Sequence, residues 1–375
     1  MVAGRRTYAG LFLVTLATLL DEILLTRIFS VATWYHFAFL AISIAMLGMT
    51  LGAVAVAVFG RAFAEERTRR HLALSALLFA STLGLGFLVQ VRIPFATELT
   101  AGALLGNAAI FLLATVPFAC SGVCVCLALT RFPRQVGRLY AADLAGAAIA
   151  CVAVIYFLKI TDGPTAVIGA AAIAAAGSIG FALEAGDARL VRAAIATAAV
   201  LSGAAAVHTV LVWNQRPIVR LRSVKGTVEE RPLYEAWNSF SRIRVRPSPT
   251  QSPLGWGLSQ VYRPRHDLRQ LILDIDGGAS TVLTGFDGDL EFFPEEEIAE
   301  CYFVGFDNDI SRTTFSPPLQ DRIGLGDTFR FGSPHTGGCN FVLGDGSVRT
   351  ITYSVNPAAY KNLGNIRSTA VFNAP

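Results

Sequence analysis

Charged residues are scarce in this chain. Only 15% of its 375 residues are charged, against about a quarter in a typical soluble domain. The shortage lies mainly in the first part, because residues 1–213 contain 14 Lys and Arg with 9 Asp and Glu, whereas residues 214–375 contain 17 and 18. This distribution excludes a single soluble domain, a disordered chain and a simple nucleic-acid binder. It predicts a membrane protein with a polar tail.

The apolar first part is long enough for several membrane spans. A span needs about 20 mostly apolar residues, and seven stretches qualify: 8–28, 35–59, 72–90, 101–130, 139–159, 164–183 and 190–213. Residues 101–130 are unusually long and contain Pro117, so this span is expected to kink, tilt or break, and a re-entrant hairpin there would change the number of spans. The sequence predicts a polytopic α-helical bundle over 1–213, in the lipid bilayer, followed by a small, mostly β extramembrane region.

Positive charge predicts the orientation. The N-terminus and the connections 60–71, 131–138 and 184–192 carry eleven Lys and Arg, whereas the alternate connections carry three. Because such residues concentrate on the cytoplasmic side, the N-terminus is expected in the cytoplasm. With seven spans, the C-terminal tail is expected outside the cell (inner) membrane.

Four charged residues fall inside or near the spans: Asp21, Glu22, Arg27 and Asp143. Charges in lipid are costly and usually form pairs or line a polar path. In one interpretation Asp143 pairs with Arg27 or Arg138 and orients the bundle. In the other, these residues belong to a proton or solute pathway.

Small residues recur at four-residue spacing in two of the spans. They are Gly48 with Gly52, and Ala142 with Gly146 and Ala150. Such rows let helix backbones approach closely in lipid. They predict a compact bundle.

The residues after the spans favour a small antiparallel β region over 214–293. Residues 241–246 alternate polar and apolar, as a half-buried strand does, and 271–275 form a second apolar run before the turn signal at Asp276. The proline-containing stretch 247–265 is expected to be a loop.

Several stretches together resemble one family. They are 22–30 (EILLTRIFS), 46–52 (MLGMTLG), 137–147 (GRLYAADLAGA), 234–242 (YEAWNSFSR) and 273–281 (LDIDGGAST). These are similar to membrane-embedded spermidine synthase-like proteins, over about residues 8–291. The resemblance implies a membrane bundle, a small β region and then a Rossmann-like aminopropyltransferase domain that binds decarboxylated S-adenosylmethionine.

The catalytic domain that this family carries has no counterpart here. After Phe293 only 82 residues remain, and none of their glycines follows a strand and opens a helix, as a nucleotide-binding loop requires. No catalytic residue and no cofactor is therefore predicted.

The end of the chain, 294–375, resembles a different family. His335, nine further residues and then Asp345-Gly346 form a motif similar to that of a pseudopilin-like domain of unknown function, associated with prepilin-type processing. The match covers about 300–370. Residues 340–352 also predict a tight hairpin around Asp345-Gly346.

The motif has two main interpretations. In the first, His335 and Asp345 bond to loop backbone and fix the hairpin. In the second, Asp307, Asp309 and Asp345 provide oxygen ligands for an extracytoplasmic calcium ion. A hydrolytic His/Asp pair would lack a nucleophile. Cys301 and Cys339, the two cysteines of the tail, could form a disulfide outside the cytoplasm.

Three functions follow from these patterns. The first is a non-catalytic membrane protein that displays the small β segment, with an envelope or pilus-like protein as partner. The second is an aminopropyltransferase relative that needs a catalytic domain from elsewhere. The third is a small-solute or polyamine transporter.

Overall fold

A computed structural model describes residues 2–34, 37–96, 100–249, 270–284, 313–322, 330–343 and 347–364. The chain divides into two compact units. The first consists of Met1–Arg244 with Ile275–Gly278, and the second of Val245–Asp274 with Ala279–Pro375.

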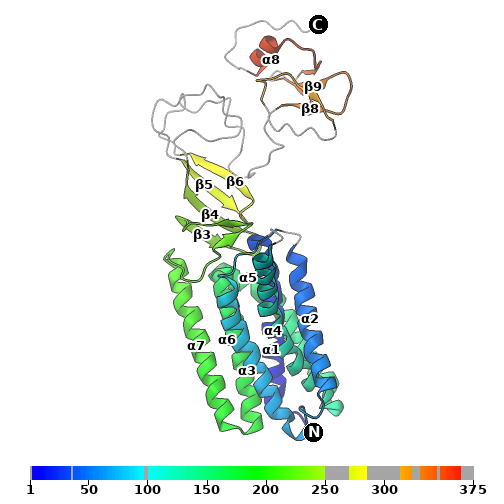
Figure 1. Cartoon of the computed structure of the whole chain (residues 1–375), viewed down its shortest axis with the longest axis vertical. Coiled ribbons are helices and arrows are strands. Elements are labelled where there is room, and N and C mark those ends of the chain that lie inside the picture. The colour runs from blue at the N-terminus through cyan, green and yellow to red at the C-terminus, as the bar shows by residue number, and fades with distance from the viewer. Residues whose placement is uncertain are drawn as a thin grey trace. The chain divides into compact units, whose positions relative to one another are not determined.

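Seven long helices make up most of the first unit (Figure 1). They are α1 (Arg5–Ala32), α2 (Ala38–Val58), α3 (Thr68–Gln90), α4 (Ala101–Thr130), α5 (Val136–Ile160), α6 (Gly163–Ala185) and α7 (Ala188–Trp213). Short 3₁₀ turns at Glu65–Arg67 and Pro133–Gln135 precede α3 and α5. All seven are long and apolar enough to cross a membrane. The predicted polytopic bundle followed by a small β region is thus confirmed.

Helix α4 is continuous through its proline. It runs for 30 residues with Pro117 in its interior. The re-entrant hairpin considered for this stretch is therefore not formed. Since Pro117 has no N–H, the carbonyl of Leu113 lacks its usual helical donor.

The helices pack in a pattern that explains the small residues. Helix α1 contacts α5 and α6, α2 contacts α4, and α3 contacts α4 and α6. A Cβ added at Gly52 would collide with the carbonyl oxygen of Ala119 in α4, and one at Gly146 would collide with that of Phe12 in α1. The predicted close approach is confirmed at both glycines. Helix α7 lies mainly against α6, and most of its side chains face outward.

Hydrogen bonds of the N-terminal segment show which interhelical connections lie at the same end of the bundle. The N–H of Ala3 donates to Oε1 of Gln135 (2.6 Å), and that of Gly4 to Oε1 of Glu184 (2.7 Å). The connections α4–α5 and α6–α7 therefore lie beside the start of α1. We call the opposite end, where α1, α3, α5 and α7 finish, the tail-side end (Figure 1).

Short strands follow the helices. Strands β1 (Ser223–Val224) and β2 (Thr227–Val228) form a hairpin. Strands β3 (Tyr234–Trp237), β4 (Arg242–Pro247), β5 (Gln270–Ile275) and β6 (Ala279–Thr284) form one sheet in that order. The strands expected at 241–246 and 271–275 are present. The turn after β5 contains Asp276 and Gly277 with φ of 52° and 62°, a left-handed conformation that Asp and Gly tolerate.

The last described segments belong to the second unit. Strands β7 (Leu319–Gln320) and β8 (Gly332–Ser333) pair in parallel, and β9 (Cys339–Val342) and β10 (Val348–Ile351) pair antiparallel. The hairpin expected over 340–352 is therefore present, although its tip lies outside the described residues. Helix α8 (Pro357–Leu363) brings the buried Tyr360 against Phe341, with 6.0 Å between ring centroids.

Candidate functional site

The intramembrane charges do not form the pairs expected from the sequence. Asp143 on α5 accepts a hydrogen bond from the hydroxyl of Thr15 on α1, with an O···O distance of 2.7 Å. Arg27 instead forms an ion pair with Asp276, 2.7 Å from nitrogen to oxygen. The predicted pairing of Asp143 with Arg27 is therefore wrong, and among the described residues no ion pair joins Asp143 to Arg138. A neutral hydroxyl satisfies this carboxylate, whereas the partner of Arg27 is almost 250 residues away in sequence.

The Arg27–Asp276 pair joins α1 to the turn after β5. The Asp276 carboxylate also accepts the backbone N–H of Arg242 at 2.7 Å, so one carboxylate bonds two elements. The Arg27 side chain is 14% exposed, and in such surroundings an ion pair is screened less than at an open surface. Arg27 and Asp276 are so far apart in sequence that no local pattern predicted their contact.

Strand β4 turns its arginines inward. The side chain of Arg242 is only 1% exposed and contacts carboxylate oxygens of Glu229 and Glu235, each at 2.9 Å. Arg244 pairs with the same Glu229 at 2.5 Å. Burial alone would raise the pKa of Glu235, but the adjacent Arg242 holds it below its usual value. For Arg242, burial lowers the pKa, yet the two carboxylates raise it above its usual value. The group stays ionised as a buried cluster.

A second polar network surrounds His208, near the tail-side end of α7. Its Nε2 accepts the backbone N–H groups of Ile218 (3.1 Å) and Val219 (2.9 Å). Nδ1 therefore carries the proton of the neutral ring and lies 2.7 Å from the hydroxyl of Thr165. The Thr165 hydroxyl in turn donates to Asp162. This network binds the chain leaving α7 to the start of α6.

Asp162 begins α6 as its N-cap. Its Oδ1 accepts the backbone N–H of Thr165 at 2.8 Å, and the residue is 4% exposed. Burial raises the pKa of Asp162 to about 7, against the opposing effect of the Thr165 hydrogen bonds. Neither Asp162 nor His208 was singled out as a site residue from the sequence, because capping and imidazole bonds to backbone depend on contacts that local patterns do not show.

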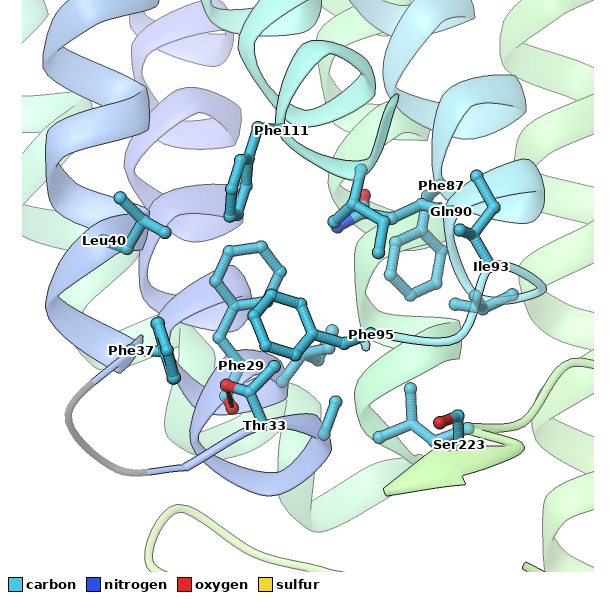
Figure 2. Close-up of a pocket in the computed structure, with 15 residues that line it drawn as sticks. Phe29, Thr33, Phe37, Leu40, Phe87, Gln90, Ile93, Phe95, Phe111 and Ser223 are labelled. Carbon is cyan, nitrogen blue, oxygen red and sulfur yellow. Dashed lines mark hydrogen bonds between the residues drawn. The ribbon is translucent and has the colours of Figure 1, made fainter. Parts of the chain in front are cut away.

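An aromatic pocket opens at the tail-side end of the bundle (Figure 2). It encloses about 540 Å³ of empty space, part of it open to the surroundings. The rings of Phe29, Phe37, Phe95 and Phe111 face this space, and Phe87 and Gln90 lie side by side along it. Phe37 and Phe95 meet edge to face, with ring centroids 5.2 Å apart. Few polar groups line it, so it suits an apolar or amphipathic molecule.

Asp21 and Glu22 lie one after the other on α1 but in different surroundings. Asp21 is 4% exposed and lines a small cavity with α3 and α4, whereas Glu22 is half-buried. Of the four intramembrane residues, Asp21 alone lines either the aromatic pocket or this small cavity.

The C-terminal motif is only partly described. His335 lies in an exposed loop, and its backbone N–H donates to Oγ of Ser333 at 3.2 Å. Asp345, Gly346, Asp307, Asp309 and Cys301 lie outside the described residues. Within the described part of the chain, no cluster of three or more His, Cys, Asp or Glu could hold a metal ion. Cys339 is a buried free thiol, and burial raises its pKa.

Tyr353 holds the loop that carries His335. Its hydroxyl lies 2.6 Å from the His335 carbonyl oxygen, 2.9 Å from that of Ser333 and 3.3 Å from that of Gly338. The hydroxyl has one proton, so it donates to one of these three carbonyl oxygens at a time. This residue follows β10, and only the fold brings it back to the loop.

Comparison with known proteins gives one family. Residues 304–358 match the family model described as SBP_bac_10, a protein of unknown function (DUF1559). No curated protein and no solved structure matches the chain. The molecule thus combines a multi-pass, membrane-type helical bundle with a C-terminal DUF1559 segment. This agrees with the resemblance that the His335 motif indicated.

Proposed function

We propose that this protein is a non-catalytic integral membrane protein that displays its DUF1559 segment outside the cytoplasm. The observation that supports this most is the distribution of arginines over the two ends of the bundle. The start of α1 and the connections α2–α3, α4–α5 and α6–α7 lie at one end and carry eleven Lys and Arg. Since that end is expected in the cytoplasm, the tail-side end and the chain after α7 face the opposite side.

The proposed origin is a spermidine synthase-like membrane protein that has lost its aminopropyltransferase domain. The stretches 22–30, 137–147 and 234–242 support it. Two of these contribute to the contacts described above: Arg27 pairs with Asp276, and Arg242 pairs with Glu229 and Glu235. In this proposal the inherited bundle and β strands act as a scaffold, and the DUF1559 segment provides the new surface.

Reporter fusions test the orientation. Alkaline phosphatase or green fluorescent protein is attached after Pro375 of the full chain in a bacterial host. We expect an active phosphatase and no fluorescence, because both reporters respond to the side of the membrane. The same reporters inserted after Arg134, in the α4–α5 connection, are the control and should give the reverse. A fluorescent fusion after Pro375 with inactive phosphatase contradicts the display function.

A photo-crosslinking amino acid tests the partner. Val342 and Val348 are opposite each other in the β9–β10 hairpin and are 74% and 67% exposed, which is a large apolar exposure for a pair on one hairpin. We expect both positions to crosslink to one protein of the cell envelope. Arg189, in the α6–α7 connection, serves as the control position and should not give that product. The absence of a product at both valines, or the same product at Arg189, contradicts the proposed partner.

A further inference from the structure

Asp21 is a buried carboxylate without a cation. It is 4% exposed, and its one electrostatic neighbour of note is Glu22, which has the same charge. No described residue forms a hydrogen bond or an ion pair with it. An ionised carboxylate without a counter-ion within an apolar bundle is very costly in free energy. Binding of a proton or a cation removes this cost, because it neutralises the charge.

The other helices near Asp21 offer no compensating charge. Between His71 and the end of α3 there is no charged residue, and α2 and α4 contain none at all. The acid of α6, Glu184, accepts backbone N–H groups of Gly4 and Thr7 at the other end of the bundle. On α5, Asp143 is bonded to Thr15, and the cations Arg138 and Lys159 are exposed near the two ends of the helix. On α1 itself, Arg27 is paired with Asp276.

The cavity beside Asp21 is lined by two residues with polar side chains, Asp21 and Gln90, among apolar ones. Its walls come from α1, α3 and α4 and include Gln90, Leu113 and Pro117. Pro117 cannot donate to the carbonyl of Leu113, and both of these residues line the cavity together with Asp21. It has room for about one water molecule. Asp21 and Gln90 offer fewer side-chain oxygens than the about six to eight that a calcium ion takes, but they suffice to hold a water molecule that exchanges a proton with Asp21.

The small cavity adjoins the aromatic pocket at the tail-side end. Phe87 and Gln90 line the small cavity and also the aromatic pocket, so they form the wall that the two spaces share. Gln90 is 7% exposed, and its amide makes no hydrogen bond with a described residue. Its amide is therefore available to a water molecule passing between the two spaces.

From this geometry we infer that Asp21 is a proton-binding site within the membrane, which exchanges protons with the tail-side solution through the aromatic pocket. The protonated carboxyl gives its proton to the cavity water, and this water passes it beside Gln90 to the water in the pocket. The inference is independent of the display function. It also assigns the proton pathway considered for the intramembrane charges to Asp21, and not to Asp143 or Arg27.

Carbodiimide labelling of the full chain in proteoliposomes tests the site. Dicyclohexylcarbodiimide is apolar and modifies protonated carboxyl groups, and mass spectrometry locates the adduct. We expect Asp21 to be modified, with labelling that falls at least tenfold as the pH is raised. Glu22→Gln is the matched control, because it removes the neighbouring acid and should leave the adduct at Asp21. Asp21→Asn should abolish the adduct. If this variant does not fold, the position of the adduct in the wild type and in Glu22→Gln still tests whether Asp21 is the labelled site.

A second measurement tests the route. Infrared spectroscopy follows hydrogen–deuterium exchange of the Asp21 carboxyl after transfer to heavy water. Ala32→Trp places an indole in the aromatic pocket, which Ala32 lines, and should slow this exchange about tenfold. Ala206→Trp, on the outward face of α7, should not change it.

Three results would overturn the inference. Asp21 could remain unlabelled at every pH. Sodium chloride, but not choline chloride, could protect it at constant pH, which would assign a metal cation to the site. Finally, exchange in Ala32→Trp could equal that of the wild type, which would place the access route elsewhere.

Discussion

Asp162, the buried N-cap of α6, should make the stability of the protein depend on pH. Because burial raises its pKa to about 7 from the ordinary 3.8, the folded protein retains a proton there that the unfolded chain has lost. This contribution to the free energy of unfolding is complete below about pH 4 and disappears as the pH rises through 7. The difference of pKa corresponds to about 4 kcal/mol at 1.36 kcal/mol per unit.

The variant Asp162→Asn isolates this effect. Asn caps a helix as well as Asp does, but its amide carries no charge at any of these pH values. Equilibrium unfolding in mixed micelles, followed by tryptophan fluorescence between pH 4 and pH 8, gives both stability curves. We expect the wild type to lose about 4 kcal/mol more than Asp162→Asn across this range. Subtracting the two curves removes the contribution of every other group.

Asp187→Asn is the matched control. Asp187 caps α7 in the same way through the N–H groups of Arg189 and Leu190, but its side chain is 26% exposed. Its substitution should leave the pH dependence of the wild type unchanged. If wild type and Asp162→Asn lose stability in parallel as the pH rises, the Asp162 carboxyl is already ionised in the folded protein and the reasoning is refuted.

Three further substitutions test the packing. Gly52→Leu should abolish the yield of monodisperse protein in detergent, because its side chain would collide with Ala119 of α4, whereas Gly203→Leu, whose Cβ meets nothing, should not. Arg242→Met should lower the free energy of unfolding by about 3–5 kcal/mol, since it leaves the largely buried carboxylate of Glu235 without its cation, whereas Glu229 retains Arg244; adding Glu235→Gln should recover part of the loss, and no recovery would contradict the ionised cluster. Tyr353→Phe should cost about 1 kcal/mol and speed amide exchange over 333–338 but not in β9, which mass spectrometry reads directly; equal protection in both proteins would exclude its hydroxyl as the loop's support.

Patterns that are local in sequence predicted the larger part of the fold. The length and apolar composition of seven stretches are sufficient to predict the seven helices. The spacing of the small residues, which include Gly48, Gly52 and Gly146, predicted where helix backbones approach each other. The alternation over 241–246 predicted a strand but not which face is buried. In the structure Arg242 and Arg244 point inward, because Glu229 and Glu235 come from other segments to neutralise them.

The candidate sites were less accessible to sequence reasoning. Asp21 and Glu22 are adjacent in sequence, and only the packing of α3 and α4 distinguishes the residue that faces a cavity. His208 lies near the end of α7, where a polar ring is ordinary, yet it bonds Thr165 and the backbone of Ile218 and Val219. Such contacts join residues distant in sequence, and one sequence contains no periodicity that reveals them.

The ion pair between Arg27 and Asp276 has a consequence for biosynthesis. The partners are separated by 249 positions, and at about 5–20 residues per second the ribosome needs about 12–50 s to reach the second after the first. During this interval α1 has left the ribosome while its arginine has no counter-ion. The first helix to be inserted is therefore completed by a segment that is translated after all seven helices, and a chain that stops before Asp276 leaves this arginine without its counter-ion.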